Sequence, residues 1–196
     1  MISQNQIKAI AADRPTPFYL YSEDDITKDL QYVNSCFSWQ SDYRNYFPMK
    51  DNPNPAILKL LWDAGSGILA CGRAELLLAK RCGFMGSRLM YQPVTKDAQA
   101  EQLASELETC WLLTSPEYLP SCPVKTVFLR VYPDHGCVSA SDLMRIKSGL
   151  PLKQLIEILQ TLKIRNVPNI GLELQMKAFD LRPQAYVNKA RILLSL

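Results

Sequence analysis

The sequence predicts an α/β fold with parallel strands, and the spacing of its apolar runs is the main reason. The first four runs of the regular series start near residues 46, 67, 88 and 110, so successive starts are 21 or 22 residues apart. A helical pattern follows each of the first three runs. Such a strand-then-helix step implies right-handed crossovers between parallel strands. Periodicity alone leaves a (β/α) barrel and an open α/β sheet as alternatives.

The N-terminal part predicts one strand and one helix. Residues 18–21 are rich in aromatic side chains and follow Pro17, which is typical of a strand. Ser22 is a helix cap, and Asp25 stands three residues later as the acid of a capping box. Apolar residues then recur at helical spacing: Ile26, Leu30, Val33 and Phe37.

The next segment carries the best-defined helix start. A strand over residues 46–49 runs into Lys50, and Asn54 and Pro55 are a helix cap and a first helical residue. The helix ends before Gly65. The remaining elements follow in alternation: strands over 67–71, 88–92, 110–114, 125–132 and 170–174, helices over 73–82, 96–108 and 152–165, and a further cap signal at 115–117.

Length, composition and charge exclude several classes of protein. The 196 residues suit one domain, and 47% are hydrophobic, which argues against disorder. The 22 basic and 19 acidic residues give a net charge of +3. The sequence therefore lacks the strong excess of basic residues that is typical of proteins that bind nucleic acid or an anionic membrane. No apolar run approaches the length of a membrane span, and the first residues lack a signal peptide pattern. We therefore expect a cytoplasmic protein.

Cysteine and histidine are too scattered to predict a metal site. The six cysteines form no CxxC pair, and the only histidine is His135. A zinc site needs clustered ligands, and a disulfide scaffold is usually shorter and denser in cysteine. We expect reduced, mostly buried thiols, no metal, and a polar turn at His135.

Lys50 is the candidate catalytic residue, because it stands where an apolar strand ends and a loop begins. In a barrel this position faces the catalytic mouth. A lysine among apolar and aromatic neighbours can act as an amine nucleophile toward an aldehyde. The alternative is a solvated loop lysine.

Two separated motifs resemble the fold-type III pyridoxal-phosphate (PLP) decarboxylases, the group that contains diaminopimelate, ornithine and arginine decarboxylases. The first is Thr-Pro-Phe-Tyr-Leu-Tyr at residues 16–21, and the second spans residues 46–58. In that family the lysine of a pattern like Tyr-Ala-Val-Lys-Ala-Asn-x-Asn-Pro holds the cofactor as a Schiff base. The matching residues here are Lys50, Asn52, Asn54 and Pro55.

Further stretches are similar to later parts of the family pattern. The turn after residues 65–71 ends on Glu75, and the strand over 127–131 carries Arg130. Residues 114–117 and 147–150 resemble a strand exit and a Lys-Phe-Gly motif. The resemblance implies that Lys50 is catalytic and that PLP is held by Lys50, Glu75, Arg130 and Gln175.

The chain departs from the family at several positions. The histidine that stacks on the cofactor ring corresponds to Gln175, followed by Met176 and Lys177 in place of Gly-Ser. An acidic residue expected before the second turn is absent. The family's phosphate-binding turn is rich in glycine, whereas Gly171 is the one glycine beyond residue 150. These departures weaken the expectation of ring stacking and full activity.

The resemblance implies an incomplete TIM-type (β/α) barrel of about six parallel strands, preceded by an N-terminal strand. We expect an N-terminal strand segment at residues 1–24 and a partial PLP-binding barrel domain at residues 25–196. A complete TIM barrel takes about 250 residues. Two strands and the family's C-terminal β-domain have no counterpart in the sequence.

The function implied is a PLP-dependent decarboxylase acting on a basic or diamino acid, working as a homodimer or with a complementary C-terminal chain. Its partners would be a small-molecule amino acid, and neither nucleic acid nor a membrane. Two alternatives stay open. One is a truncated, non-catalytic relative that binds the cofactor or a partner protein, and the other is an amino-acid racemase-like barrel.

Overall fold

A single six-stranded parallel sheet forms the centre of the molecule, with its strands in the order of the sequence. The computed structural model describes residues 2–132, 149–175 and 182–195. Every neighbouring pair is parallel. The strands are β1 (Tyr46–Pro48), β2 (Gly67–Ala70), β3 (Leu89–Tyr91), β4 (Cys110–Leu113), β5 (Thr126–Arg130) and β6 (Asn169–Glu173). The parallel α/β fold is confirmed, and the described strands form an open sheet.

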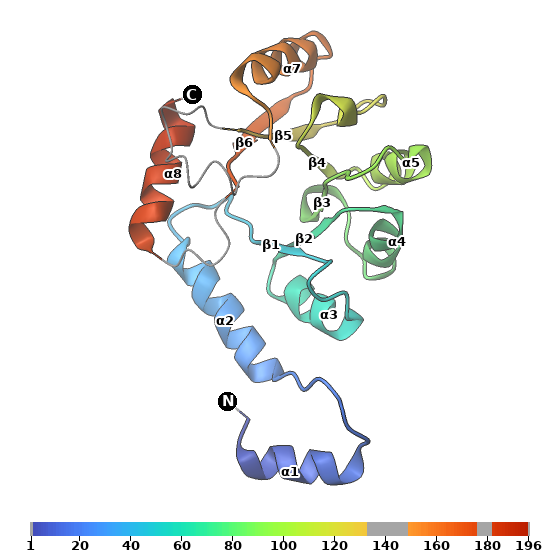
Figure 1. Ribbon diagram of the computed structural model, residues 1–196, viewed down its shortest axis with the longest axis vertical. Coiled ribbons are helices and arrows are strands. Elements are labelled where there is room, and N and C mark those ends of the chain that lie inside the picture. The colour runs from blue at the N-terminus through green and yellow to red at the C-terminus, as the bar shows by residue number, and fades with distance from the viewer. Residues whose placement is uncertain (1, 133–148, 176–181, 196) are drawn as a thin grey trace.

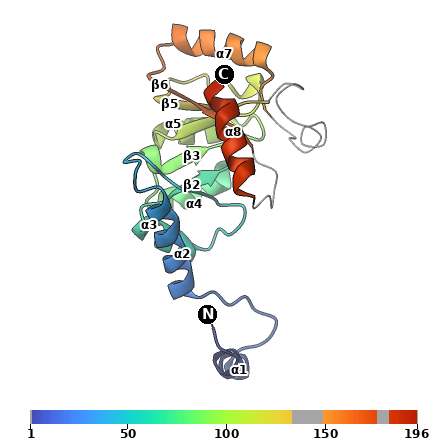
Figure 2. The same cartoon turned by 90° about the vertical axis from the view of Figure 1, so that its left-hand side faces the viewer.

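The strands follow an arc, and the helices divide between its two sides. The helices α3, α4, α5 and α7 cover the convex side, whereas α2 and α8 lie toward the open side (Figures 1 and 2). The helix α1 lies apart from the rest. Their bounds are α1 (Gln4–Asp13), α2 (Glu23–Cys36), α3 (Pro55–Asp63), α4 (Arg73–Arg81), α5 (Ala98–Glu106), α7 (Leu152–Ile164) and α8 (Pro183–Ser195), with 3₁₀ helices η1 (Gly86–Arg88) and η2 (Pro116–Tyr118).

Side-chain caps explain where two helices of the convex side, α3 and α5, begin. The Asn54 side-chain oxygen accepts the Ala56 N–H at 2.9 Å, and Pro55 takes the first helical position, as predicted. Asp97 caps α5 by accepting from the N–H groups of Gln99 and Ala100. These caps fix the helix starts close to the carboxyl ends of the preceding strands.

The two faces of the sheet carry two separate apolar clusters. The larger one packs between the sheet and the helices and includes the fully buried Leu58, Leu76 and Leu129. The smaller one lies on the inner face of the arc. Its members are Met90, Cys110 and Leu112, with Tyr46, Leu69 and Phe128 packed against them.

Two glycines make room for aromatic rings on the inner face. A Cβ on Gly67 would lie 2.7 Å from the Tyr46 ring, and one on Gly171 would lie 2.6 Å from the Phe128 ring. Each glycine is the direct register partner of that aromatic residue on the neighbouring strand. The rings therefore lie flat across adjacent strands and fill the inside of the arc below the carboxyl ends.

The predicted N-terminal strand does not form. Residues 18–21 have no strand partner in the described part of the chain, and Tyr19 is 90% exposed. The ring of Tyr19 stacks on that of Tyr21 instead, with centroids 6.5 Å apart. Since a strand needs a neighbour for its backbone groups, aromatic composition alone was insufficient. The helix α1, capped by Ser3, was not predicted.

The connection between β4 and β5 contains no α-helix, unlike those that follow β1, β2 and β3. The cap signal at residues 115–117 opens only the short η2. Pro120 and Pro123 follow closely, and proline lacks the N–H that a growing helix needs. The other predicted elements lie within a few residues of their expected positions, while His135 and the Lys147–Ser148 pair fall outside the described residues.

The expectation of buried thiols is only partly correct. Of the described cysteines, all free, Cys110 is buried and Cys36 is exposed, while Cys71, Cys82 and Cys122 are intermediate.

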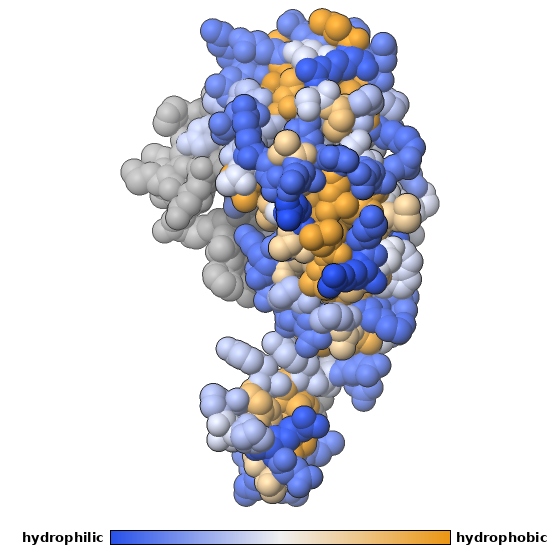
Figure 3. Space-filling view, turned by 90° about the vertical axis from the view of Figure 1, so that its right-hand side faces the viewer, coloured by the Kyte–Doolittle hydropathy of each residue, from blue (hydrophilic) through white to orange (hydrophobic). Residues whose placement is uncertain are grey.

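Within the described ranges no helix combines the length and apolarity that a bilayer crossing needs. The outer surface of the helical layer is largely hydrophilic and carries one central apolar strip (Figure 3).

Candidate functional site

The candidate site lies at the carboxyl ends of the strands, on the inner face of the arc. Side chains two residues apart on a strand share a face. Leu69 and Phe128 belong to the inner cluster, so Cys71 and Arg130 also face inward, one step nearer the carboxyl end. Lys50 stands two residues beyond Pro48, the register partner of Leu69. Parallel strands bring these three positions to one edge of the sheet.

Lys50 is carried on a tight turn directly after β1. The Met49 N–H donates to the Leu69 carbonyl at 2.9 Å, and the Asp51 N–H donates back to the Pro48 carbonyl at 3.1 Å. Lys50 is exposed, and among the described residues its amine makes no hydrogen bond or ion pair. An exposed side chain does not fit the expectation of a lysine enclosed by apolar and aromatic neighbours.

The asparagines of the Lys50 motif shape the loop. The Asn52 side chain accepts the Asn54 N–H at 3.2 Å, and Asn54 in turn caps α3. Pro48, which lacks an N–H, is tolerated because β1 is the edge strand of the described sheet. The motif thus fixes the path of the backbone from the strand end to the helix.

Cys71 lies close to the charged groups of the site. Glu75 in the first turn of α4 accepts the Cys71 N–H at 2.7 Å. Burial raises the pKa of the Cys71 thiol, and the Glu75 carboxylate raises it further, whereas the Lys50 ammonium and the Arg130 guanidinium act in the opposite direction. Three predicted site residues, Lys50, Glu75 and Arg130, are therefore close to one thiol.

Arg130 has a partner that the sequence did not reveal. Its Nε lies 2.5 Å from Oε2 of Glu173, its register partner on β6. Arg130 is buried, with 8% exposed, whereas the Glu173 side chain is 32% exposed, so the guanidinium side of the ion pair is the one shielded from water. The available signal was that Glu173 stands in the predicted strand over residues 170–174, two residues before the candidate site residue Gln175.

Gln175 lies just beyond β6 and is only loosely connected to the other site residues. Its side-chain oxygen is buried and has no hydrogen-bond partner. Lys189 of α8 donates to its backbone carbonyl at 3.4 Å. A buried amide oxygen usually has a donor, so this acceptor is available to a donor from outside the described residues.

Together, the fold and the site define one class of architecture: a parallel (β/α) sheet with an accessible lysine at the carboxyl end of its first strand. Polar groups from β2, α4, β5 and β6 line the same edge. A primary amine in such a place is suited to covalent chemistry with an aldehyde.

Sequence comparisons match this chain to curated relatives that are about twice as long. It is 31% identical to protein TabA of Pseudomonas amygdali pv. tabaci, over 88% of this chain and 42% of the relative. Identity is 23% to the lysine/ornithine decarboxylase of Selenomonas ruminantium and 27% to the diaminopimelate decarboxylase of Deinococcus radiodurans, covering 94% and 89% of this chain and 47% of each relative. No protein-family model matches the chain.

Solved structures show the same fold. The lysine decarboxylase from Selenomonas ruminantium matches with a TM-score of 0.79 at 21% identity, over 98% of this chain and 51% of that one. The diaminopimelate decarboxylase from M. jannaschii in complex with L-lysine matches with a TM-score of 0.81 at 18% identity, over 95% and 48%. The chain therefore resembles part of lysine and diaminopimelate decarboxylases, has the fold of their solved structures, and spans about half the length of the relatives it matches.

Proposed function

We propose that this chain is the lysine-bearing half of a PLP-dependent decarboxylase that acts on a basic or diamino acid. The observation that carries the proposal is the position of Lys50. Its amine lies at the carboxyl end of β1 without an ion-pair partner among the described residues, within electrostatic range of Cys71. The relatives named lysine/ornithine and diaminopimelate decarboxylase support the substrate class, and a matched structure of SrLDC holds PLP and cadaverine.

The residues present fit part of such a cofactor. Lys50 would hold its aldehyde carbon, and Arg130, Glu75 and Gln175 would be the polar groups closest to it. The unpartnered side-chain oxygen of Gln175 is the observation that favours a missing donor here. When bound, PLP supplies an electron sink for the charge left on the substrate when carbon dioxide departs.

The chain's own groups would orient the substrate and handle protons. The Lys50 amine can carry a proton to or from the reacting carbon, because it is accessible and is not tied up by a carboxylate of the described residues. The Arg130 guanidinium, fixed by Glu173, presents a fixed positive charge that can face a substrate carboxylate. Glu75 is fixed by the Cys71 N–H and can face a substrate ammonium group.

The partner of this chain would be a second polypeptide segment. We propose that full activity requires the region that the relatives have beyond the matched half, supplied by a complementary chain or within a homodimer. That region would add the glycine-rich turn for the phosphate, since only glycine lets backbone N–H groups crowd an anion.

The first experiment asks whether PLP reacts at Lys50. The chain is incubated with PLP, reduced with borohydride and analysed by intact mass and peptide mapping. We expect one cofactor attached at Lys50, because borohydride converts a lysine–aldehyde linkage to a stable secondary amine. Lys59→Arg is the matched control, since Lys59 is an exposed lysine paired with Asp63 on α3. Equal labelling of Lys50→Arg and Lys59→Arg would reject the assignment.

A second candidate function is cofactor or partner binding without catalysis. The specific observation in its favour is that Gln175 stands where the family's ring-stacking histidine is expected. Carbon dioxide release from ornithine, lysine, arginine and diaminopimelate separates the two. Specific labelling of Lys50 with no release, alone or with a complementary C-terminal half, would favour the binding function.

A further inference from the structure

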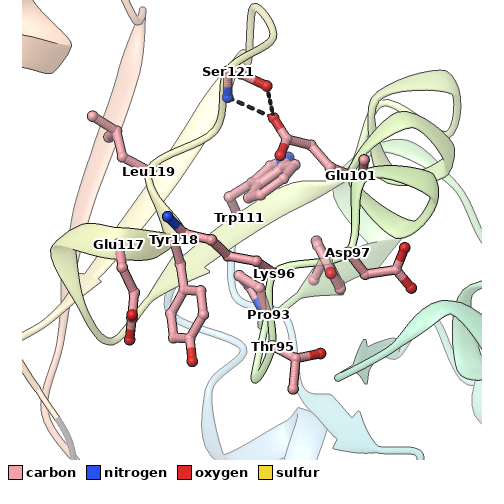
Figure 4. Close-up of a pocket in the computed structure, with 12 residues that line it drawn as sticks. Pro93, Thr95, Lys96, Asp97, Glu101, Trp111, Glu117, Tyr118, Leu119 and Ser121 are labelled. Atoms are coloured by element: carbon pink, nitrogen blue, oxygen red, sulfur yellow. Dashed lines mark hydrogen bonds between the residues drawn. The ribbon is translucent and has the colours of Figure 1, made fainter.

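A second site lies on the other side of the sheet, where the β4–β5 connection lacks a crossover helix. An open pocket of about 440 Å³ lies between α5, the β3–α5 connection and η2. Figure 4 shows Trp111 behind the opening, with Glu101 and Ser121 joined on one side and Glu117 and Tyr118 on the other. None of these residues belongs to the candidate site around Lys50.

Hydrogen bonds hold the rim of the pocket in place. The Tyr118 hydroxyl donates to the Val94 carbonyl at 2.9 Å, which fastens η2 to the β3–α5 connection. On the opposite side, the Glu101 carboxylate accepts from the Ser121 N–H at 2.5 Å and also from the Ser121 hydroxyl. The pocket is therefore formed before any ligand arrives, so binding need not order these connections.

Two aromatic side chains form the floor of the pocket. Tyr91 and Trp111 are each only 2% exposed, and their rings meet edge to face with centroids 5.0 Å apart. Aromatic walls of this kind attract organic cations as well as apolar groups. The floor thus suits a ligand that combines methylene groups with positive charge.

The Tyr91 hydroxyl is an unused polar group in this floor. It lines the pocket, and no hydrogen bond from it to another described residue is recorded. Burial, together with the nearby carboxylates of Asp97 and Glu101, raises the pKa of Tyr91 to about 12. The hydroxyl therefore stays protonated near neutral pH and can accept a hydrogen bond from an ammonium group. Because Tyr91 lines the pocket, its hydroxyl is open to a donor from a ligand.

Charge at the pocket favours a cation with separated positive groups. The carboxylates of Asp97, Glu101 and Glu117 line it, against the single amine of Lys96. Yet within the described residues no three or more acidic, histidine or cysteine side chains are grouped closely enough to hold a metal ion. Spread carboxylates match ammonium groups at the two ends of a chain better than one compact ion.

We propose that this pocket binds an aliphatic diamine, with its methylene chain against Trp111 and its ammonium groups near the Tyr91 hydroxyl and the carboxylates of Asp97 and Glu117. The proposal does not depend on catalysis at Lys50, since the pocket lies on the outer face of the sheet. It can therefore stand or fail separately from the proposed function.

Isothermal titration calorimetry of the 196-residue chain with 1,5-diaminopentane tests the proposal. The titration is repeated on Lys50→Arg, so that any binding around Lys50 is recognised. We expect saturable binding that is unchanged in Lys50→Arg and weakens as salt is added, because the attraction is partly electrostatic. Pentylamine should bind several-fold more weakly, and 1,5-pentanediol should not bind.

Variants locate the ligand within the pocket. Asp97→Asn keeps an oxygen for the cap of α5, and Glu117→Gln changes an exposed side chain; together they should weaken binding roughly 10-fold. Tyr91→Phe should weaken it roughly 3-fold through loss of one hydrogen bond. Glu157→Gln on α7 removes one negative charge away from the pocket and should have no effect. Equal affinity in the double variant and Glu157→Gln, loss of binding in Lys50→Arg, or no saturable binding would each overturn the proposal.

Discussion

The region from β1 to β3 and the region from β4 to β6 are built on one sheet but covered differently. In the first, each strand leads into an α-helix that buries apolar side chains against the sheet. In the second, β4 reaches β5 through η2 and a proline-containing segment. The first region carries the lysine motif, and the second carries the Arg130–Glu173 pair and the outer pocket.

The β4–β5 connection shows that a strand can stay buried although no α-helix follows it. Trp111 and Leu113 on β4 stay buried because Tyr118, Leu119, Cys122 and Val124 pack against the core in place of a helix. These side chains fill less space than a helix would, and the pocket beside α5 remains open. A shorter connection can therefore preserve the fold while opening a new surface.

The largest expected loss of stability comes from shortening the apolar side chains that pack on the sheet in each region. Leu76→Ala on α4 removes a fully buried side chain and should lower the free energy of unfolding by about 2–5 kcal/mol. Leu119→Ala in the β4–β5 connection removes a half-buried one and should cost about 1 kcal/mol. Urea unfolding measures both. Leu77→Ala, on the exposed face of α4, is the control, and equal losses at positions 76 and 119 would show that the connection covers the core as well as a helix does.

The two tyrosines that line the pocket, Tyr91 on β3 and Tyr118 on η2, should affect protein stability differently at alkaline pH. Since the folded pKa of Tyr91 is about 12 and the ordinary value is 10.0, the unfolded chain loses this proton first. Its stabilising contribution is complete below pH 10 and disappears as pH rises to about 12.

The measurement is the free energy of unfolding as a function of pH, with Tyr91→Phe and Tyr118→Phe compared. Tyr91→Phe should remove most of the alkaline decline that this residue causes. Tyr118→Phe should change the decline less, although its pKa is also raised by burial and by Glu117. Identical pH profiles for wild type and Tyr91→Phe would contradict the expectation.

The smallest expected effects compare two ion pairs. Glu173→Gln removes the partner of a buried guanidinium and should cost about 1–3 kcal/mol. Glu108→Gln breaks the exposed pair with Lys125, 3.0 Å long, and should cost less than about 1 kcal/mol. Thermal unfolding at low and high salt tests both, and only the exposed pair should weaken with salt. An equal response of the two pairs would mean that the Arg130 pair is open to water.

Local chemistry made much of the fold predictable. Asn54 and Pro55 lie within five residues of Lys50 and specify the start of the helix that follows it, and the regular strand spacing predicts the parallel sheet. The Arg130–Glu173 pair could not be predicted, because it depends on the register of strands whose residues lie 43 positions apart. The fate of residues 18–21 likewise depends on a strand partner rather than on their own aromatic side chains.

The prolines of the β4–β5 connection were visible in the sequence, but their consequence was not. Pro120 and Pro123 signal a missing helix, whereas the pocket requires the positions of α5, η2 and Tyr91 in space. The hydrogen bond between the Cys71 N–H and the Glu75 carboxylate could not be predicted either. An acidic residue in the first turn of a helix is typical of capping, but the sequence does not say which N–H donates to it.

The proline at the end of β1 has a consequence for the behaviour of the protein in solution. An outer strand of a sheet can recruit strands from other molecules and so start aggregation. β1 has only three residues, and Pro48 leaves one backbone donor fewer on that edge. This edge of the sheet, which leads to Lys50, is therefore poorly suited to seed intermolecular β-structure.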